Sequence, residues 1–67
     1  MKKLFKDKNI LVTGAGGSIG SELIRHLLTN KMYSPNKVVG LDNNENSIFF
    51  LDQAYINFKN VIFFVSD

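Results

Sequence analysis

Four of the chain's five glycines lie within seven consecutive positions, in the run Thr13-Gly14-Ala15-Gly16-Gly17-Ser18-Ile19-Gly20. Apolar residues 10–12 precede this run and an amphipathic pattern follows it, so the sequence predicts a strand, a glycine turn and a helix start. Such a turn can bind the pyrophosphate of a dinucleotide, because glycine lets the backbone come close and the amide groups of the helix start point at the ligand. These residues therefore suggest cofactor binding.

The spacing of the glycines narrows this interpretation. Gly14, Gly17 and Gly20 form G-x-x-G-x-x-G, whereas a G-x-G-x-x-G motif that began at Gly14 would need glycine where Ile19 stands. The spacing resembles the variant of short-chain dehydrogenase/reductase proteins. A flexible glycine loop or an ordinary strand-to-helix turn is the alternative. The preceding strand, the following helix and an acidic residue downstream all favour the dinucleotide.

Asp42 is the second candidate binding residue. It ends a predicted strand 22 residues after Gly20, near the spacing at which an acidic side chain meets the adenosine ribose. A carboxylate accepts hydrogen bonds from ribose hydroxyls and repels a 2′-phosphate, and residues 43–45 add no cation. We therefore expect NAD in preference to NADP. Asp42 could instead begin the turn into the next helix, and the two roles are compatible.

The hydrophobic pattern predicts strands at 9–13, 37–42 and 61–65 and helices at about 18–31 and 45–57. We expect Ser18 and Ser21 to supply acceptors to the first helical turn, Glu22 to add negative charge there, and Asn43 and Asn44 to cap the second helix. The expected buried faces are Ile19, Leu23, Ile24, Leu27 and Leu28 in the first helix and Ile48, Leu51 and Tyr55 in the second.

Alternating strands and helices predict an α/β fold with three parallel strands and two helices on one face of the sheet. This is the first β-α-β-α-β half of a doubly wound Rossmann-type NAD(P)-binding fold. The strands are apolar at nearly every position, as in sheets that are buried on both faces. We therefore expect residues 1–67 to be the incomplete N-terminal half of an NAD(P)-binding domain, which self-associates through the uncovered sheet face.

Length and composition exclude several classes of protein. The chain has 67 residues, 45% of them hydrophobic and 21% charged, no cysteine and a net charge of +2, which is typical of one globular domain at most. The longest apolar run, 61–65, is too short to span a membrane, and we expect a cytoplasmic location. Lys2, Lys3, Lys6 and Lys8 are interpreted as a solvated lead-in, and nucleic acid is not an expected partner.

We expect no catalytic residue and no metal site in this chain. Two Tyr-x-x-x-Lys pairs occur, Tyr33 with Lys37 and Tyr55 with Lys59. Pro35 interrupts the first pair, and the second lies at the end of a helix that finishes at the amino edge of the sheet, away from the expected cofactor. His26 is the only histidine, and without cysteine or a second histidine it is interpreted as structural.

Residues 8–23, with the stretch G-G-S-I-G-S-E-L, together with residues 41–45 and a third strand that ends in Asp67, resemble the polysaccharide-biosynthesis proteins of the extended short-chain dehydrogenase/reductase superfamily. These are nucleotide-sugar 4,6-dehydratases and related epimerases. The resemblance runs from about residue 8 to the last residue. It implies that the backbone around Ser18 and Ile19 meets the pyrophosphate and that Asp67 accepts a hydrogen bond from the adenine amino group.

The resemblance also implies a reaction for the parent protein. A bound NAD would take hydride from C4 of a UDP-linked sugar, UDP-N-acetylglucosamine being the expected one, allow loss of water across C5 and C6, and return the hydride to C6. The Tyr-x-x-x-Lys pair and the acid/base residues of the family come from the later part of the domain. A nucleotide-sugar 4-epimerase, and an NAD-binding sensor or vestigial module without activity, remain as alternatives.

Overall fold

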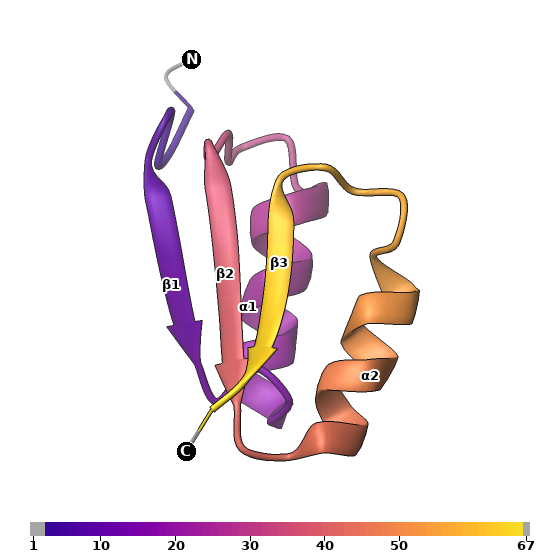
Figure 1. The fold of residues 1–67 in the computed structure, drawn as a ribbon. Helices are drawn as coiled ribbons and strands as arrows, with labels where there is room; N and C mark the ends of the chain where they lie inside the picture. Colours follow the sequence, from indigo (N-terminus) through magenta and orange to yellow (C-terminus); the bar gives the residue numbers. More distant parts are fainter. Residues whose placement is uncertain (1–2, 67) are drawn as a thin grey trace.

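Three parallel strands and two helices alternate along the chain (Figure 1). The computed structural model describes residues 3–66. The elements are β1 (Asn9–Thr13), α1 (Ser18–Thr29), β2 (Lys37–Asp42), α2 (Glu45–Ala54) and β3 (Val61–Val65). All three strand predictions are confirmed to the residue. The long apolar runs bounded by polar turns account for this accuracy.

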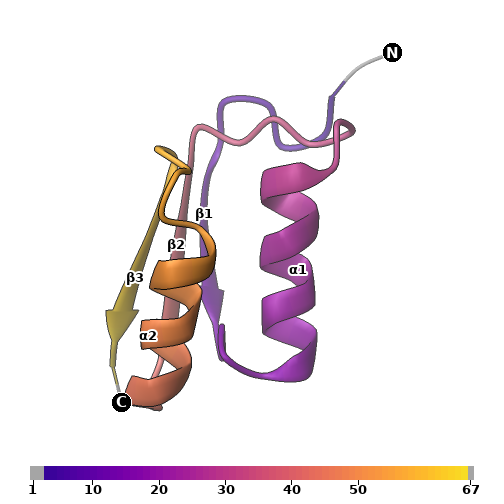
Figure 2. The same cartoon turned by 90° about the vertical axis from the view of Figure 1, so that its right-hand side faces the viewer.

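The sheet has the order β1-β2-β3. Register aligns Val12 of β1 with Gly40 of β2, and Gly40 in turn with Phe63 of β3. Both helices lie on the same face of the sheet, as the two views show (Figures 1 and 2). The predicted α/β class, with parallel strands and helices on one face, is therefore confirmed, since each strand-to-strand crossover has the usual right-handed path.

The core lies between this face and the helices. Within the described part of the chain it contains eight buried apolar residues: Val12, Ala15, Ile24, Leu27, Val38, Ile48, Leu51 and Phe63. The strands contribute alternate residues, as the two-residue period of a strand requires. The predicted buried face of the second helix is confirmed at Ile48 and Leu51, while Tyr55 is partly buried against this core.

The predicted stripe of the first helix is only partly right. Ile24 and Leu27 are buried and Leu28 is partly buried, but the side chain of Ile19 is 85% exposed and that of Leu23 is 42% exposed. The reason is that α1 packs mainly over β1 and β2, so only one narrow side of the helix meets the sheet. Ile19 and Leu23 face away from the three strands.

Both helices end earlier than predicted. α1 stops at Thr29, because the side-chain oxygen of Asn30 accepts a hydrogen bond from Met32 N–H at 2.9 Å and favours a turn over another helical residue. α2 stops at Ala54, and Phe58 N–H donates to the carbonyl of Tyr55 at 2.9 Å within the next turn. These turns bring the chain back to the amino edge of the sheet.

The segment before β1 is paired with the loop after α1. Leu4 forms an isolated parallel bridge with Tyr33, and the ring of Phe5 stacks on that of Tyr33 with centroids 5.8 Å apart. Lys3, Lys6 and Lys8 are exposed, which agrees with the predicted solvated lead-in, and Lys2 lies outside the described residues. Across residues 3–66, no helix has the length and apolar character needed to cross a membrane.

Among residues 3–66, no helix lies on the second face of the sheet (Figure 2). Leu11, Val39 and Ile62 are aligned across the three strands by the register, and Leu41 and Phe64 form the next row. On this face Leu11 is 61% exposed, Phe64 49% and Ile62 44%. An apolar sheet face open to water is unusual for a folded protein that works alone.

Candidate dinucleotide site

The glycine turn between β1 and α1 begins at Gly14. Its φ of +64° lies in the left-handed region, which residues with a β-carbon rarely adopt. Ala15, the next residue, is completely buried, and its N–H donates to the carbonyl of Leu41 at 2.9 Å. The turn is therefore fixed against the end of β2 by both packing and a main-chain hydrogen bond.

The start of α1 follows at once. Gly17 is the N-cap and offers no side-chain acceptor, and the first backbone bond of the helix runs from Ser21 N–H to Gly17 O at 2.9 Å. The N–H groups of residues 18–20 are thus the helix-start donors that lack an acceptor within the helix. They carry the positive end of the helix dipole, which favours an anion.

Two predictions about this helix start are wrong. The N-cap is Gly17 rather than a serine, and Ser21 Oγ donates to the carbonyl of Ser18 at 3.3 Å instead of accepting from an amide. Glu22 lies beyond the first turn, where its carboxylate bonds the guanidinium of Arg25 and lies 3.3 Å from His26 Nε2. The Arg25 hydrogen bond lowers the pKa of Glu22. The first turn of α1 therefore carries no acidic residue of its own.

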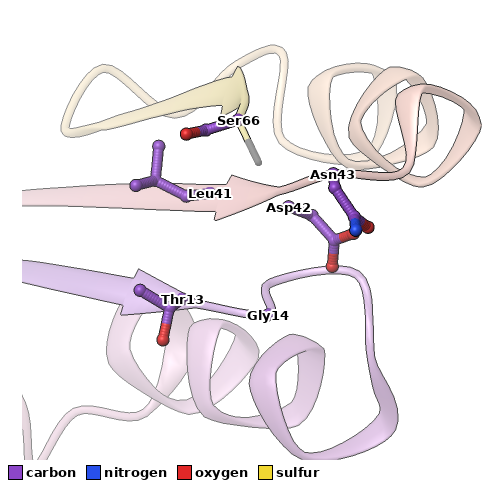
Figure 3. A pocket seen from close by; sticks show the side chains of 6 residues that line it. All are labelled: Thr13, Gly14, Leu41, Asp42, Asn43 and Ser66. Carbon is purple, nitrogen blue, oxygen red and sulfur yellow. The ribbon is translucent and has the colours of Figure 1, made fainter.

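Asp42 stands at the carboxyl end of β2 and is partly exposed. Its Oδ1 accepts from Asn44 N–H at 2.8 Å and its Oδ2 accepts from Gly16 N–H, also at 2.8 Å. These hydrogen bonds, that of Asn44 first and then that of Gly16, lower the pKa of the Asp42 carboxyl group. The side chain is therefore an anion at neutral pH, and it points toward the glycine turn (Figure 3).

A hollow of about 290 Å³ opens where the three strands end (Figure 3). Its lining residues come from the ends of all three strands: Thr13, Gly14, Leu41, Asp42, Asn43 and Ser66. Open α/β sheets bind ligands in the crevice outside the carboxyl ends of their strands. The hollow is therefore in the position that a cofactor-binding site takes in this class of fold.

The structure brings most of the predicted binding residues to this edge. Gly14 and Asp42 line the hollow, and residues 17–20 form the adjoining helix start. Asp67 lies outside the described residues, directly after Ser66. The turn into α2 has the predicted cap, because Asn44 Oδ1 accepts from Ser47 N–H at 3.0 Å.

Sequence reasoning overlooked two glycines. A β-carbon on Gly16 would lie 2.5 Å from Ser47 Cβ, so this glycine lets the turn touch the first turn of α2. A β-carbon on Gly40 would lie 2.7 Å from the Phe63 ring and 3.1 Å from Ala15 Cβ. A single glycine inside a strand pattern often marks such a close approach, and this signal could have identified Gly40.

The remaining candidates lie elsewhere. Tyr33 is in the loop after α1, and Tyr55 is the C-cap of α2, at the end of the helix remote from the carboxyl edge of the sheet (Figure 1). Neither tyrosine lines the hollow. His26 lies on the surface of α1 with its Nε2 3.3 Å from the Glu22 carboxylate, and within residues 3–66 no three His, Asp or Glu side chains gather to hold a metal ion.

Sequence comparison identifies related proteins. Residues 10–66 match the family model described as polysaccharide biosynthesis protein. Over 47 residues the chain is 49% identical to the capsular polysaccharide biosynthesis protein CapD of Staphylococcus aureus, a match that covers 70% of this chain and 7% of CapD.

Two solved structures share the fold. Pen from Bacillus thuringiensis superposes with a TM-score of 0.79 at 30% identity, over 96% of this chain and 18% of that protein. A short-chain dehydrogenase from Shigella flexneri, solved in complex with NADP, superposes with a TM-score of 0.68 at 28% identity, over 100% of this chain and 27% of that protein. The chain thus spans less than a third of the length of each protein it matches here.

Proposed function

The chain belongs to the polysaccharide biosynthesis protein family, and from this premise we propose that it is the dinucleotide-binding segment of a nucleotide-sugar-modifying enzyme of the short-chain dehydrogenase type. One observation carries the proposal. Gly14 and Asp42 line the hollow where the strands end, and the glycine turn that begins at Gly14 leads directly into the free N–H groups at the start of α1. A dinucleotide carries a diphosphate that such N–H groups can bind and a ribose diol that such a carboxylate can bind.

Binding of the pyrophosphate is assigned to the glycine turn. Gly14 shapes the turn, Gly20 allows the helix to pack on it, and Gly17 leaves its outer side open. The backbone of Ser18 and Ile19 would then donate to the phosphate oxygens. The exposed side chain of Ile19 does not obstruct this, because the donor is its main-chain amide. Asp67 is proposed to accept from the adenine amino group.

NAD is the form of the cofactor that we propose. The anionic carboxylate of Asp42 can accept from the ribose hydroxyls, and it repels the 2′-phosphate of NADP. Residues 43–45, Asn43, Asn44 and Glu45, offer no guanidinium or ammonium group to compensate for that repulsion. The NADP complex of the Shigella flexneri protein supports a nicotinamide dinucleotide of one form or the other. The argument for NAD depends on Asp42.

The reaction of the whole protein is proposed to be 4,6-dehydration of a UDP-sugar, with UDP-N-acetylglucosamine as substrate, in the synthesis of a surface polysaccharide. The nicotinamide ring, when bound, supplies the hydride acceptor and donor. The residues of this chain bind and orient the cofactor, and the acid/base groups belong to other parts of the protein. CapD supports the polysaccharide role through its name. A cytoplasmic location is part of this proposal.

We further propose that residues 1–67 form the N-terminal half of the cofactor-binding domain. The bare apolar face with Leu11, Ile62 and Phe64 supports this, because further helices of a doubly wound fold would cover it. When nothing else covers this face, the chain is expected to self-associate through it.

Calorimetric titration of the chain with NAD, NADP and UDP-N-acetylglucosamine tests the proposal. We expect NAD to bind more tightly than NADP, and we expect no 4-keto product from this chain alone. Absence of binding by either dinucleotide would refute the assignment. A 4-keto product from this chain would show that the catalytic groups have been misplaced.

A further inference from the structure

The glycine turn is joined to the start of α2 by a continuous series of contacts. Gly16 N–H donates to Asp42 Oδ2, Asn44 N–H donates to Asp42 Oδ1, and Ser47 N–H donates to Asn44 Oδ1. Ser47 closes the series, because a β-carbon on Gly16 would lie 2.5 Å from Ser47 Cβ. These four residues, Gly16, Asp42, Asn44 and Ser47, are called the turn brace below.

The brace connects segments that are distant in sequence. Gly16 and Asp42 are 26 residues apart, and their hydrogen bond joins the turn after β1 to the turn after β2. Hydrogen bonds from amides to a carboxylate are stronger than those between neutral groups. Asp42 is therefore well suited to fix the position of the glycine turn.

Asp42 can fill this role and still contact a ribose. A carboxylate has about four lone-pair sites, of which the amides of Gly16 and Asn44 use two. Asp42 also lines the hollow at the strand ends, so a ligand in the hollow can reach its side chain. Holding the turn and binding the ribose are thus simultaneous rather than competing roles.

We propose that Asp42 is a positioning residue that sets the shape of the glycine turn before any ligand binds, in addition to facing the ribose. The identity of the ligand rests on the proposed function, whereas the brace is a property of the ligand-free chain. It follows that affinity for pyrophosphate and selection against the 2′-phosphate are coupled at one carboxylate. A substitution of Asp42 that admits NADP would also weaken binding by the turn.

A purely ribose-binding Asp42 predicts different behaviour. Its removal would leave the ligand-free turn unchanged. It would also improve the binding of a small anion, because a negative charge beside the site is lost. The two accounts therefore predict opposite changes in the affinity for inorganic pyrophosphate when Asp42 is replaced. This ligand has no ribose, so the loss of a ribose contact does not affect it.

Amide hydrogen exchange on the ligand-free chain is the first test. Asp42→Asn leaves one of the two amide donors facing an NH₂ group, so exchange at Gly16 or Asn44 should become at least about tenfold faster. Asp52→Asn makes the same charge change at an exposed position of α2 and should leave both rates unchanged. The proposal would be overturned if the exchange rates at Gly16 and at Asn44 were the same in Asp42→Asn as in the wild type.

A pH titration of the wild-type chain keeps the test valid if Asp42→Asn fails to fold. The amide proton shifts of Gly16 and Asn44 should titrate together, with one midpoint below the usual aspartate pKa, since both bond the same carboxylate. Glu45 carries the neighbouring carboxylate, and its own amide is followed as an internal comparison. Separate midpoints, or no titration at Gly16, would contradict the brace.

Inorganic pyrophosphate supplies the final comparison. We expect Asp42→Asn to bind it at least about fivefold more weakly than Asp52→Asn, and equal or tighter binding would overturn the positioning role. If the wild-type chain does not bind pyrophosphate at all, the proposed function fails. The exchange rates at Gly16 still decide whether the brace exists.

Discussion

Gly14 and Gly20 are in backbone contact across the glycine turn. A β-carbon on Gly20 would lie 2.8 Å from the carbonyl carbon of Gly14 and closer still to its oxygen. The first and last glycines of the G-x-x-G-x-x-G spacing therefore depend on each other: Gly14 reverses the chain with its φ of +64°, and Gly20 lets α1 lie directly on the reversed chain. Gly17, between them, is the one whose outer side stays open.

Gly20→Ala should destabilise the fold. The added methyl group meets the backbone of Gly14, which cannot move without shifting the end of β1, and overpacking of this kind costs about 1–3 kcal/mol. Urea unfolding followed by circular dichroism measures the change. A variant that is as stable as the wild type would show that the turn is looser than described.

Gly17→Ala should instead weaken cofactor binding with little effect on stability. Its β-carbon would be 3.4 Å from Gly14 O and otherwise in open space, so stability should change by less than about 1 kcal/mol. Binding of NAD should nonetheless weaken at least about tenfold, because the methyl group occupies the approach to the phosphate. Unchanged affinity in a calorimetric titration would place the pyrophosphate elsewhere.

Replacing Asp42 with alanine should narrow the preference for NAD over NADP. The negative charge that repels the 2′-phosphate is lost, and so is the acceptor for the ribose hydroxyls. The ratio of the two dissociation constants measures this directly, and Asp52→Ala on the exposed side of α2 is the matched control. A ratio unchanged from wild type would mean that Asp42 does not face the ribose.

The stability of the chain should fall in acid through Asp42. Its pKa in the folded state is lowered by the amides of Asn44 and Gly16, so its contribution is fully present above the unfolded pKa of about 3.9. The contribution is lost as the pH falls from there through the lower folded pKa. The free energies of unfolding of the wild type and of Asp42→Asn should therefore differ at pH 6, and this difference should shrink as the pH falls below about 3.9. A difference that does not shrink below that pH would contradict this.

Leu11→Lys should reduce self-association. Leu11 is 61% exposed on the bare sheet face, and a lysine there would have to lose its hydration in any contact between two such faces. Phe50→Lys is the control, since Phe50 is 70% exposed on α2 instead. Sedimentation equilibrium should show a shift toward monomer only for Leu11→Lys, and equal effects would exclude the sheet face as the contact.

The three strands and their parallel direction could be predicted, because each apolar run is bounded by turn residues and the helical periodicity between the runs is clear. The helix ends could not, because the side chain of Asn30 competes with the helix and the turn after Ala54 is closed by a hydrogen bond from Phe58 N–H to the Tyr55 carbonyl. The exposure of Ile19 and Leu23 depends on how much sheet lies beneath α1. The hydrophobic periodicity of a helix does not show how wide the sheet beneath it is.

Part of the candidate site could likewise be predicted from the sequence, and part could not. Gly14, Gly20 and Asp42 could be found from spacing, since their roles follow from a turn and a strand end. The hydrogen bond from Gly16 to Asp42 could not, because it joins two turns whose separation in space appears only once the strands are aligned. The predicted serine acceptor at the start of α1 is absent, because the turn places Gly17 at the N-cap position.

The most direct test of the account is titration of the isotope-labelled chain with NAD, followed by amide resonances. The account predicts saturable shifts that are largest at residues 14–20 and at Asp42, with little change at Tyr55 and Lys59 at the opposite end of the sheet. No shift at the glycine turn, or the largest shifts at the far end, would contradict it.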